Sequence, residues 1–278
     1  MRGAGITAAL PFVGAMGAYV ALRSLHGGLA EETIYFIVSI LAVGAAALGS
    51  FVAALTLDAG DYMRRPWTLM GVCYGLLVLN ALLFRTTSRF EAQDISALSV
   101  ALSGVLIFAG NVCSVWGTVQ IARVWRVAGL DLRVPSAVRW LAIGISLSLA
   151  LALVGDLTRQ DLQTLAGGDL RVLPSLASNA GDVVSLTLVA PILLTAFALR
   201  GGNLGWPWAL LAFGSLGWLM YGAAPLVGAY LGVDESLMRA FGAALRTFAC
   251  LAQMSAGLLQ ALVVMEPERP LPAHLAHA

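Results

Sequence analysis

The chain has 278 residues and a net charge of +1, and 59% of its residues are hydrophobic whereas only 11% are charged. Soluble domains carry about 25% charged residues, so this composition excludes an ordinary water-soluble domain. A net charge this small gives no basic field, which excludes nucleic acid as a partner. All 16 basic residues are arginine. Chemistry that needs a lysine Schiff base, such as a retinal linkage, is therefore excluded as well.

Apolar segments of about 20 residues, the length that crosses a bilayer, recur along the whole chain. The first lies within residues 1–25 and predicts a retained transmembrane helix, with a cleaved signal peptide as the alternative. The eight segments predict an all-α integral membrane protein, in which a seven-helix core and one additional N-terminal helix give eight transmembrane helices. In chain order they cover roughly residues 3–22, 33–57, 66–84, 95–122, 138–155, 183–199, 205–231 and 240–265.

The connections between the segments predict the orientation. Nine arginines flank the segments on one side and six on the other, with four of the nine in the connection 123–139. The arginine-rich side is expected to be cytoplasmic, so both termini lie inside, as in a multi-pass protein of a bacterial inner membrane. The longest connection, from about Asp156 to Asp182, is predicted to be an outer loop or a short surface helix. Residues 266–278 are predicted to be a disordered cytoplasmic tail.

Two stretches of the sequence match at a constant offset of 141 residues. They predict a duplicated three-helix unit, residues 33–122 and 183–265, which the helix 138–155 joins in a parallel 3+1+3 layout. Coincidence remains the alternative, because proline favours the first turn of a helix and tryptophan the membrane interface. The matched positions are Pro66-Trp67-Thr68-Leu69 with Pro207-Trp208-Ala209-Leu210, Gly60 with Gly201, and Asp94 with Glu235.

This layout resembles that of small sugar transporters and PQ-loop proteins, which are built from parallel repeats. The resemblance covers the layout only, because the Pro-Gln dipeptides that are diagnostic of PQ-loop proteins are missing from this sequence. The helix count also resembles that of microbial rhodopsins, but the absence of lysine argues against a pigment.

The last apolar segment carries a stripe of polar side chains. Arg239, Arg246, Gln253 and Gln260 recur at steps of seven residues, close to two helical turns, so they share one helix face. Arg246 lies roughly 10 Å inside the predicted helix. Because lipid cannot satisfy such groups, we expect the stripe to face the bundle interior. Two interpretations stay open: the wall of a binding cavity, or interhelical hydrogen bonds that hold the bundle together.

Acidic and amide side chains on other segments are candidates to complete this site. Asp182 and Asp156 are expected at the outer ends of the sixth and fifth segments, where either can pair with Arg246 or Arg239. Asn80 and Asn111 are expected deep in the third and fourth segments. The predicted ligand-binding set is Arg246, Arg239, Gln253, Gln260, Asp182, Asp156, Asn111 and Asn80.

Motifs for enzymatic chemistry are missing from the sequence. It contains no phosphate-binding loop with lysine, no zinc-type His/Glu set and no Gly-x-Ser-x-Gly elbow. We therefore predict no catalytic residue, no cofactor and no metal. The repeat and the stripe favour a transporter or permease-like protein for a small anionic solute. A membrane sensor that signals through a separate partner and an accessory subunit of a membrane complex stay open. Expected partners are the lipid bilayer, a small-molecule ligand and a membrane or cytoplasmic protein.

Overall fold

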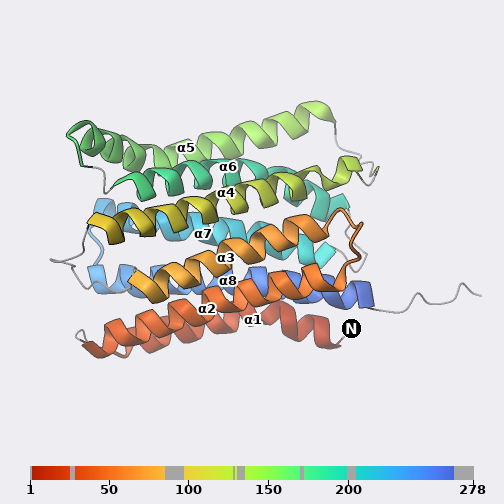
Figure 1. The fold of residues 1–278 in the computed structure, drawn as a ribbon, viewed down its shortest axis with the longest axis horizontal. Helices are drawn as coiled ribbons and strands as arrows, with labels where there is room; N and C mark the ends of the chain where they lie inside the picture. The colour runs from red at the N-terminus through yellow and green to blue at the C-terminus, as the bar shows by residue number, and fades with distance from the viewer. Residues whose placement is uncertain are drawn as a thin grey trace, which may run out of the picture.

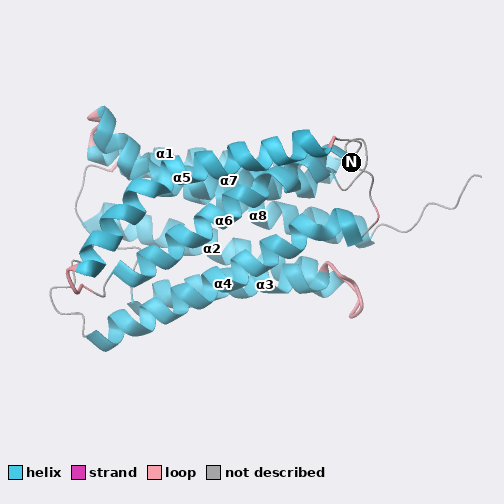
Figure 2. Ribbon diagram, turned by 90° about the horizontal axis from the view of Figure 1, so that it is seen from above, coloured by secondary structure: helices cyan, strands magenta, loops and turns pink. Residues whose placement is uncertain are grey.

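The computed structural model describes residues 2–25, 29–84, 97–127, 129, 135–169, 172–198 and 205–265, and these are almost entirely helical. The helices run back and forth along one long axis, so the start of α1 and the end of α8 lie at the same end (Figure 1). A view from above shows the same elongated bundle (Figure 2). The elements are α1 (Arg2–Arg23), α2 (Leu29–Thr56), α3 (Arg64–Phe84), α4 (Ala97–Val127), α5 (Ser136–Ala166), α6 (Leu173–Ala198), α7 (Gly205–Leu231) and α8 (Glu235–Met265).

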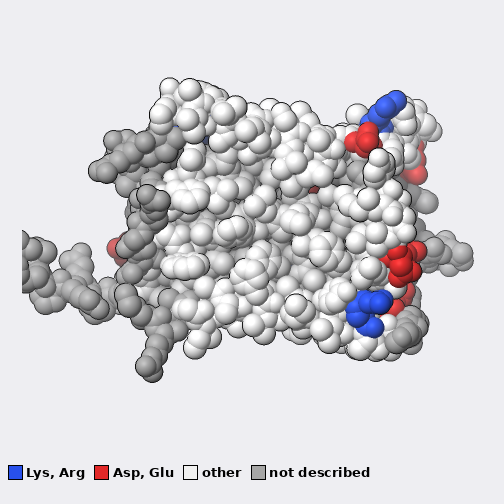
Figure 3. Space-filling model, turned by 180° about the vertical axis from the view of Figure 1, so that it is seen from behind, with Lys and Arg blue, Asp and Glu red and all other residues white. Residues whose placement is uncertain are grey.

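The surface of the bundle has the character that a membrane requires. Seven helices of the described part of the chain, α1 to α6 and α8, are long and apolar enough to cross a membrane. Large apolar side chains point outward, and on α2 Leu41, Leu48 and Leu55 are each more than 60% exposed. On the face seen in Figure 3, the charged side chains gather toward the ends and the band between is almost free of them. The protein is thus an all-α, multi-pass membrane protein.

Six helices form a closed ring. α8 packs on α2 and α7, and the ring continues through the pairs α2–α3, α3–α4, α4–α6 and α6–α7. Two helices lie outside this ring, α1 mainly against α8 and α5 mainly against α6. The described part of the predicted region 1–25 is therefore largely helical and packs on α8.

Small residues bring α2 and α8 into backbone contact. Gly49 of α2 is buried, and a Cβ added to it would lie 2.5 Å from the Cα of Met254 on α8. A Cβ added to Gly257 would in turn collide with the carbonyl group of Gly49. Transmembrane helices associate through this kind of small-residue contact, because lipid offers them no hydrophobic driving force.

The long outer connection expected between Asp156 and Asp182 is wrong. α5 continues to Ala166 and α6 begins at Leu173, so both aspartates lie inside helices. The polar run after Asp156 contains no glycine or proline before Gly167, which lets the helix continue beyond its apolar part. Pro174 stands in the first turn of α6, where a missing N–H costs nothing. The predicted tail 266–278 and the matched positions Asp94 and Gly201 lie outside the described residues.

Candidate functional site

The polar stripe on α8 faces neighbouring helices along its whole length. We call the end of the bundle where α1 begins and α8 ends the inner end and the opposite end the outer end, in line with the predicted orientation (Figure 1). At the inner end of the stripe Gln260 is buried, and the buried Gln253 amide donates a hydrogen bond of 3.1 Å to the Ser50 hydroxyl of α2. At its outer end Arg239 and Arg246 contact α2 and α7. The inner half of the stripe thus joins helices, whereas the outer half gathers charge.

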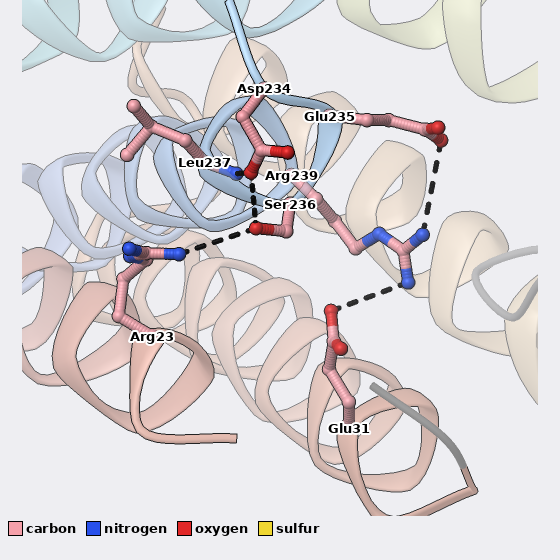
Figure 4. Close-up of polar contacts among 7 residues, drawn as sticks. All are labelled: Arg23, Glu31, Asp234, Glu235, Ser236, Leu237 and Arg239. Carbon is pink, nitrogen blue, oxygen red and sulfur yellow. Dashed lines mark hydrogen bonds and ion pairs between the residues drawn. The ribbon is translucent and has the colours of Figure 1, made fainter. Parts of the chain in front are cut away.

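The outer end of the stripe joins three helices through polar contacts (Figure 4). Arg239 forms an ion pair of 3.3 Å with Glu31 of α2 and approaches Glu235 at 3.9 Å. Arg23, which ends α1, donates a hydrogen bond to the Ser236 hydroxyl in the first turn of α8. The Glu31 side chain is only 7% exposed, so its pairing with Arg239 compensates for the loss of water.

Asp234 caps the start of α8. Its carboxylate accepts hydrogen bonds from the Ser236 hydroxyl and from the backbone N–H of Leu237, which would otherwise lack a helical acceptor. These two hydrogen bonds, the one from Ser236 first, hold the pKa of Asp234 below its usual value. The cap fixes the level at which α8 begins, and with it the positions of the stripe.

Arg246 lies among aromatic rings and not beside a carboxylate. Its guanidinium carbon lies 5.9 Å from the centre of the Trp218 ring and 5.7 Å from that of Tyr221, both on α7. The Tyr35 phenol of α2 also lies against it. The Nε atom is buried and has no hydrogen-bond partner, and no carboxylate of the described residues forms an ion pair with this arginine. Cation–π contacts offset only part of the desolvation of a guanidinium.

A hydrogen bond closes the middle of the ring below Arg246. The Trp218 indole N–H donates to the Tyr74 hydroxyl at 3.1 Å. Tyr74 belongs to α3, which lies across the ring from α7, so this bond spans the ring interior. The inner half beyond it is filled by an apolar cluster that includes the buried Trp67 and Trp208.

On the outer side of the hydrogen bond between Trp218 and Tyr74, a cavity of about 720 Å³ lies between α2, α7 and α8. Its mouth carries Glu32, Glu235 and Arg239, and its wall includes Tyr35 and Tyr221. The cavity therefore extends inward from the end where α2 and α8 begin, down to the tyrosines that contact Arg246. A cavity of this size is large enough for a small organic solute.

Asp182 belongs to α6 and approaches α7 at Gly222, whereas Asn111 belongs to α4 and approaches α6 at Gly181. Gly222 lines the cavity, and a Cβ added there would lie 3.8 Å from an Asp182 carboxylate oxygen, so this oxygen is close to the cavity wall. Asn111 of α4 lies beside Gly181, and its buried amide nitrogen has no hydrogen-bond partner. Asp182 itself forms no ion pair with any described residue.

Several of the predicted pairings differ from those observed. Glu31, and not Asp182 or Asp156, pairs with Arg239, because α2 begins beside the first turn of α8. Asp156 is exposed on α5, which packs mainly on α6, a helix that does not carry the stripe. Asn80 is buried in α3. A ligand-binding role for these residues stays a prediction.

The sequence did not single out the residues that complete the site. Glu31, Glu32 and Tyr35 lie within five residues at the start of α2, where acidic residues at a helix start are ordinary. Trp218 and Tyr221 are one turn apart on α7, and a pair of aromatic residues in an apolar helix signals core packing first. Only the contacts that these residues make with other helices of the ring mark them as part of the site.

The described residues contain no group of three His, Cys, Asp or Glu side chains that could hold a metal ion. No protein-family model, no curated protein and no solved structure matches the chain. Its function is therefore argued from the cavity and the groups around it.

Proposed function

We propose that the protein binds a small solute in the outer half of its helix bundle and that it works as a transporter or permease-like protein. One observation carries the proposal: a guanidinium without an ionic partner, that of Arg246, lies behind the wall of a 720 Å³ cavity. A charged side chain at membrane depth costs at least a few kcal/mol and marks function by default. An arginine favours a solute that carries a carboxylate or another planar anion.

In this proposal all eight helices span the membrane, α7 included. Its 27 residues carry no charge and extend about 40 Å, more than a bilayer core is thick. An even number of spans agrees with the start of α1 and the end of α8 at one end of the bundle (Figure 1). With the arginine-rich end in the cytoplasm, the cavity opens toward the outside.

The proposal includes the duplicated three-helix unit. The two Pro-Trp pairs stand in the first turns of α3 and α7, at the same end of the bundle, and both prolines and both tryptophans are buried. This burial argues against the explanation that Trp67 and Trp208 mark the membrane interface. Trp206, which is 61% exposed, suits that explanation better. In the ring, each helix of one unit has neighbours that correspond to those of its counterpart.

A sensor is the second candidate, and the filled inner half of the ring favours it. A protein that reports an external solute needs a pocket on one side only, whereas alternating access requires the inner half to open as well. Vesicles that hold the purified protein separate the two. A transporter exchanges internal labelled solute for external solute, whereas a sensor binds it without exchange.

The binding proposal is tested by the thermal stability of the purified protein with a panel of small carboxylates. A ligand at 100 times its Kd stabilises the folded state by about 2.7 kcal/mol. We expect at least one carboxylate to raise the melting temperature of the wild type and to lose this effect in Arg246→Gln. Arg159→Gln, which removes an exposed arginine of α5, should retain it. A response that both variants keep, or none in the wild type, contradicts the proposal.

A further inference from the structure

Two ionisable side chains without ionic partners, Arg246 of α8 and Asp182 of α6, approach α7 at similar depth. Arg246 lies eleven residues after the start of α8, and Asp182 nine residues after the start of α6. Both helices begin at the same end of the bundle (Figure 1), so the two residues lie about 16 and 13 Å along their helices. Arg246 lies behind Tyr221 and Asp182 beside Gly222, two consecutive residues of α7 that both line the cavity.

Arg246 and Asp182 do not form an ion pair with each other. Among the described residues, Arg239 has an ion-pair partner, whereas neither Arg246 nor Asp182 has one. Burying a charge costs much unless it is paired. If Arg246 and Asp182 served stability alone, we would expect them either to form an ion pair or to be replaced by apolar residues. Because Arg246 approaches α7 at Tyr221 and Asp182 approaches it at Gly222, a molecule in the cavity that lies across these two residues can offer a complementary charge to each.

Pro225 leaves a further acceptor on α7, in the peptide unit that joins Tyr221 to Gly222. A proline inside a helix has no N–H to donate to the carbonyl group four residues earlier, and here that carbonyl belongs to Tyr221. Pro225, Tyr221 and Gly222 all line the cavity. A carbonyl oxygen and a carboxylate together suit an ammonium group, which has three N–H donors. Gly222 keeps the wall open in front of Asp182, since any side chain there would stand against the carboxylate.

The charges at the cavity mouth argue against a purely anionic solute. Glu32 and Glu235 line the mouth, whereas Arg239 lies there already paired with Glu31. An anion would meet this acidic entrance before it reached Arg246. A solute with an ammonium group at one end is attracted by the entrance and still offers a carboxylate to the guanidinium.

We infer that the ligand of this site is a small zwitterion, with its ammonium group held by Asp182 and the Tyr221 carbonyl and its carboxylate held by Arg246. This inference rests on the proposed function and narrows its solute from an anion to an amino-acid-like molecule. Neither charged side chain forms the cavity surface itself, so the ligand reaches Arg246 by displacing the Tyr35 and Tyr221 rings.

The experiment compares one series of probes that differ in chain length and a second set that differ in charge. The purified protein is titrated with glycine, 3-aminopropanoate, 4-aminobutanoate, 5-aminopentanoate and 6-aminohexanoate, and with pentanoate and pentylamine, which carry one charge each. Melting temperature and calorimetry report binding. We expect one chain length to bind best, because it matches the separation of the two sites. The matching probes without an ammonium or without a carboxylate should bind about 10- to 100-fold more weakly, the usual effect of one lost charge-assisted contact.

Two variants test which side chain binds which end of the ligand. Asp182→Asn should lower the affinity for the best amino acid to that for pentanoate, and Arg246→Gln should lower it to that for pentylamine. Asp182→Glu and Arg246→Lys keep the charges and should restore part of the binding, which separates recognition from a loss of folding. Melting without ligand shows that each variant folds.

The results that overturn the inference are distinct from those that overturn the proposed function. If pentanoate binds as tightly as every amino acid and Asp182→Asn changes nothing, the site is an anion site: the proposed function stands and the zwitterion does not. If no probe binds the folded wild type, or if Arg246→Gln leaves all affinities unchanged, both fail.

Discussion

The two halves of the helix ring differ in what their inward positions carry, although the same helices build both. In the inner half, α8 presents Ala252 and Ala256, each fully buried, to an apolar cluster. In the outer half, the same helix presents Arg239, Gly242 and Arg246 to a cavity and to aromatic rings. The first arrangement excludes a ligand, and the second leaves space and unsatisfied charge.

Glycine has two roles in this bundle: it allows close helix contact in the inner half and keeps the cavity open in the outer half. Gly49 and Gly257 let the backbones of α2 and α8 touch, so any added methyl meets main-chain atoms that cannot move aside. Gly222 and Gly242 stand where α7 and α8 separate, and a methyl there would meet side chains at 3.7 to 3.8 Å, an ordinary contact distance. The inner glycines serve stability, and the outer ones maintain the cavity.

We expect the largest loss of stability when a methyl group is added at the contact between α2 and α8 in the inner half. Gly49→Ala places a methyl 2.5 Å from the Met254 backbone, which forces α2 and α8 apart and costs about 3 kcal/mol. Gly44→Ala is the matched control on the same helix, because its added methyl meets nothing within 4 Å. It should be neutral or stabilise slightly, since alanine has the higher helix propensity. Thermal unfolding in detergent measures both.

Equal melting temperatures for Gly49→Ala and Gly44→Ala would show that the two helices separate at little cost. The inner half would then be able to open, and the comparison between a closed inner half and an open outer half would lose its basis. That result would strengthen the transporter over the sensor, because alternating access needs this crossing to loosen.

Long apolar segments made the all-helical, multi-pass architecture predictable, because a bilayer allows little else than helices of about this length. Helix ends were less predictable. The sequence after Asp156 is polar, and hydropathy assigns polar residues to loops, although nothing in it breaks a helix before Gly167. The eight-helix span count and the repeat rest on α7 and on matches that partly lie outside the described residues.

The stripe on α8 was predictable because residues seven apart share one face of an α-helix, whichever helices pack against it. Its partners were not, because pairing depends on which helices are neighbours. α2 and α8 are some 200 residues apart in sequence, and only the closed ring brings Glu31 to Arg239 and Tyr35 to Arg246. The expected pairing of Asp156 with the stripe is not observed, since Asp156 lies on α5, a helix outside the ring.

A smaller effect is expected at the cavity mouth. Glu31→Gln leaves Arg239, whose side chain is 25% exposed, without its closer carboxylate. The expected loss is about 1–2 kcal/mol, between the values for surface and buried ion pairs. Glu235→Gln is the control, since Glu235 is 69% exposed and lies 3.9 Å from the same arginine. It should change the melting temperature little. Comparable losses for both would mean that the mouth responds to total charge and not to this pair.

The smallest effect is expected at the cap of α8, and it depends on pH. Hydrogen bonds from Ser236 and Leu237 hold the pKa of Asp234 below its ordinary value of 3.8. Because the folded-state pKa is the lower one, the carboxylate stabilises the fold above pH 3.8, and this contribution is lost as the pH falls through the folded-state value. Asp234→Asn should therefore melt below the wild type at pH 7 and approach it under acid conditions. A constant difference between the two melting temperatures from pH 7 to pH 3 would mean that the Asp234 charge contributes nothing. The start of α8 would then be held by the ion pair between Arg239 and Glu31 and by the contact between Arg23 and Ser236.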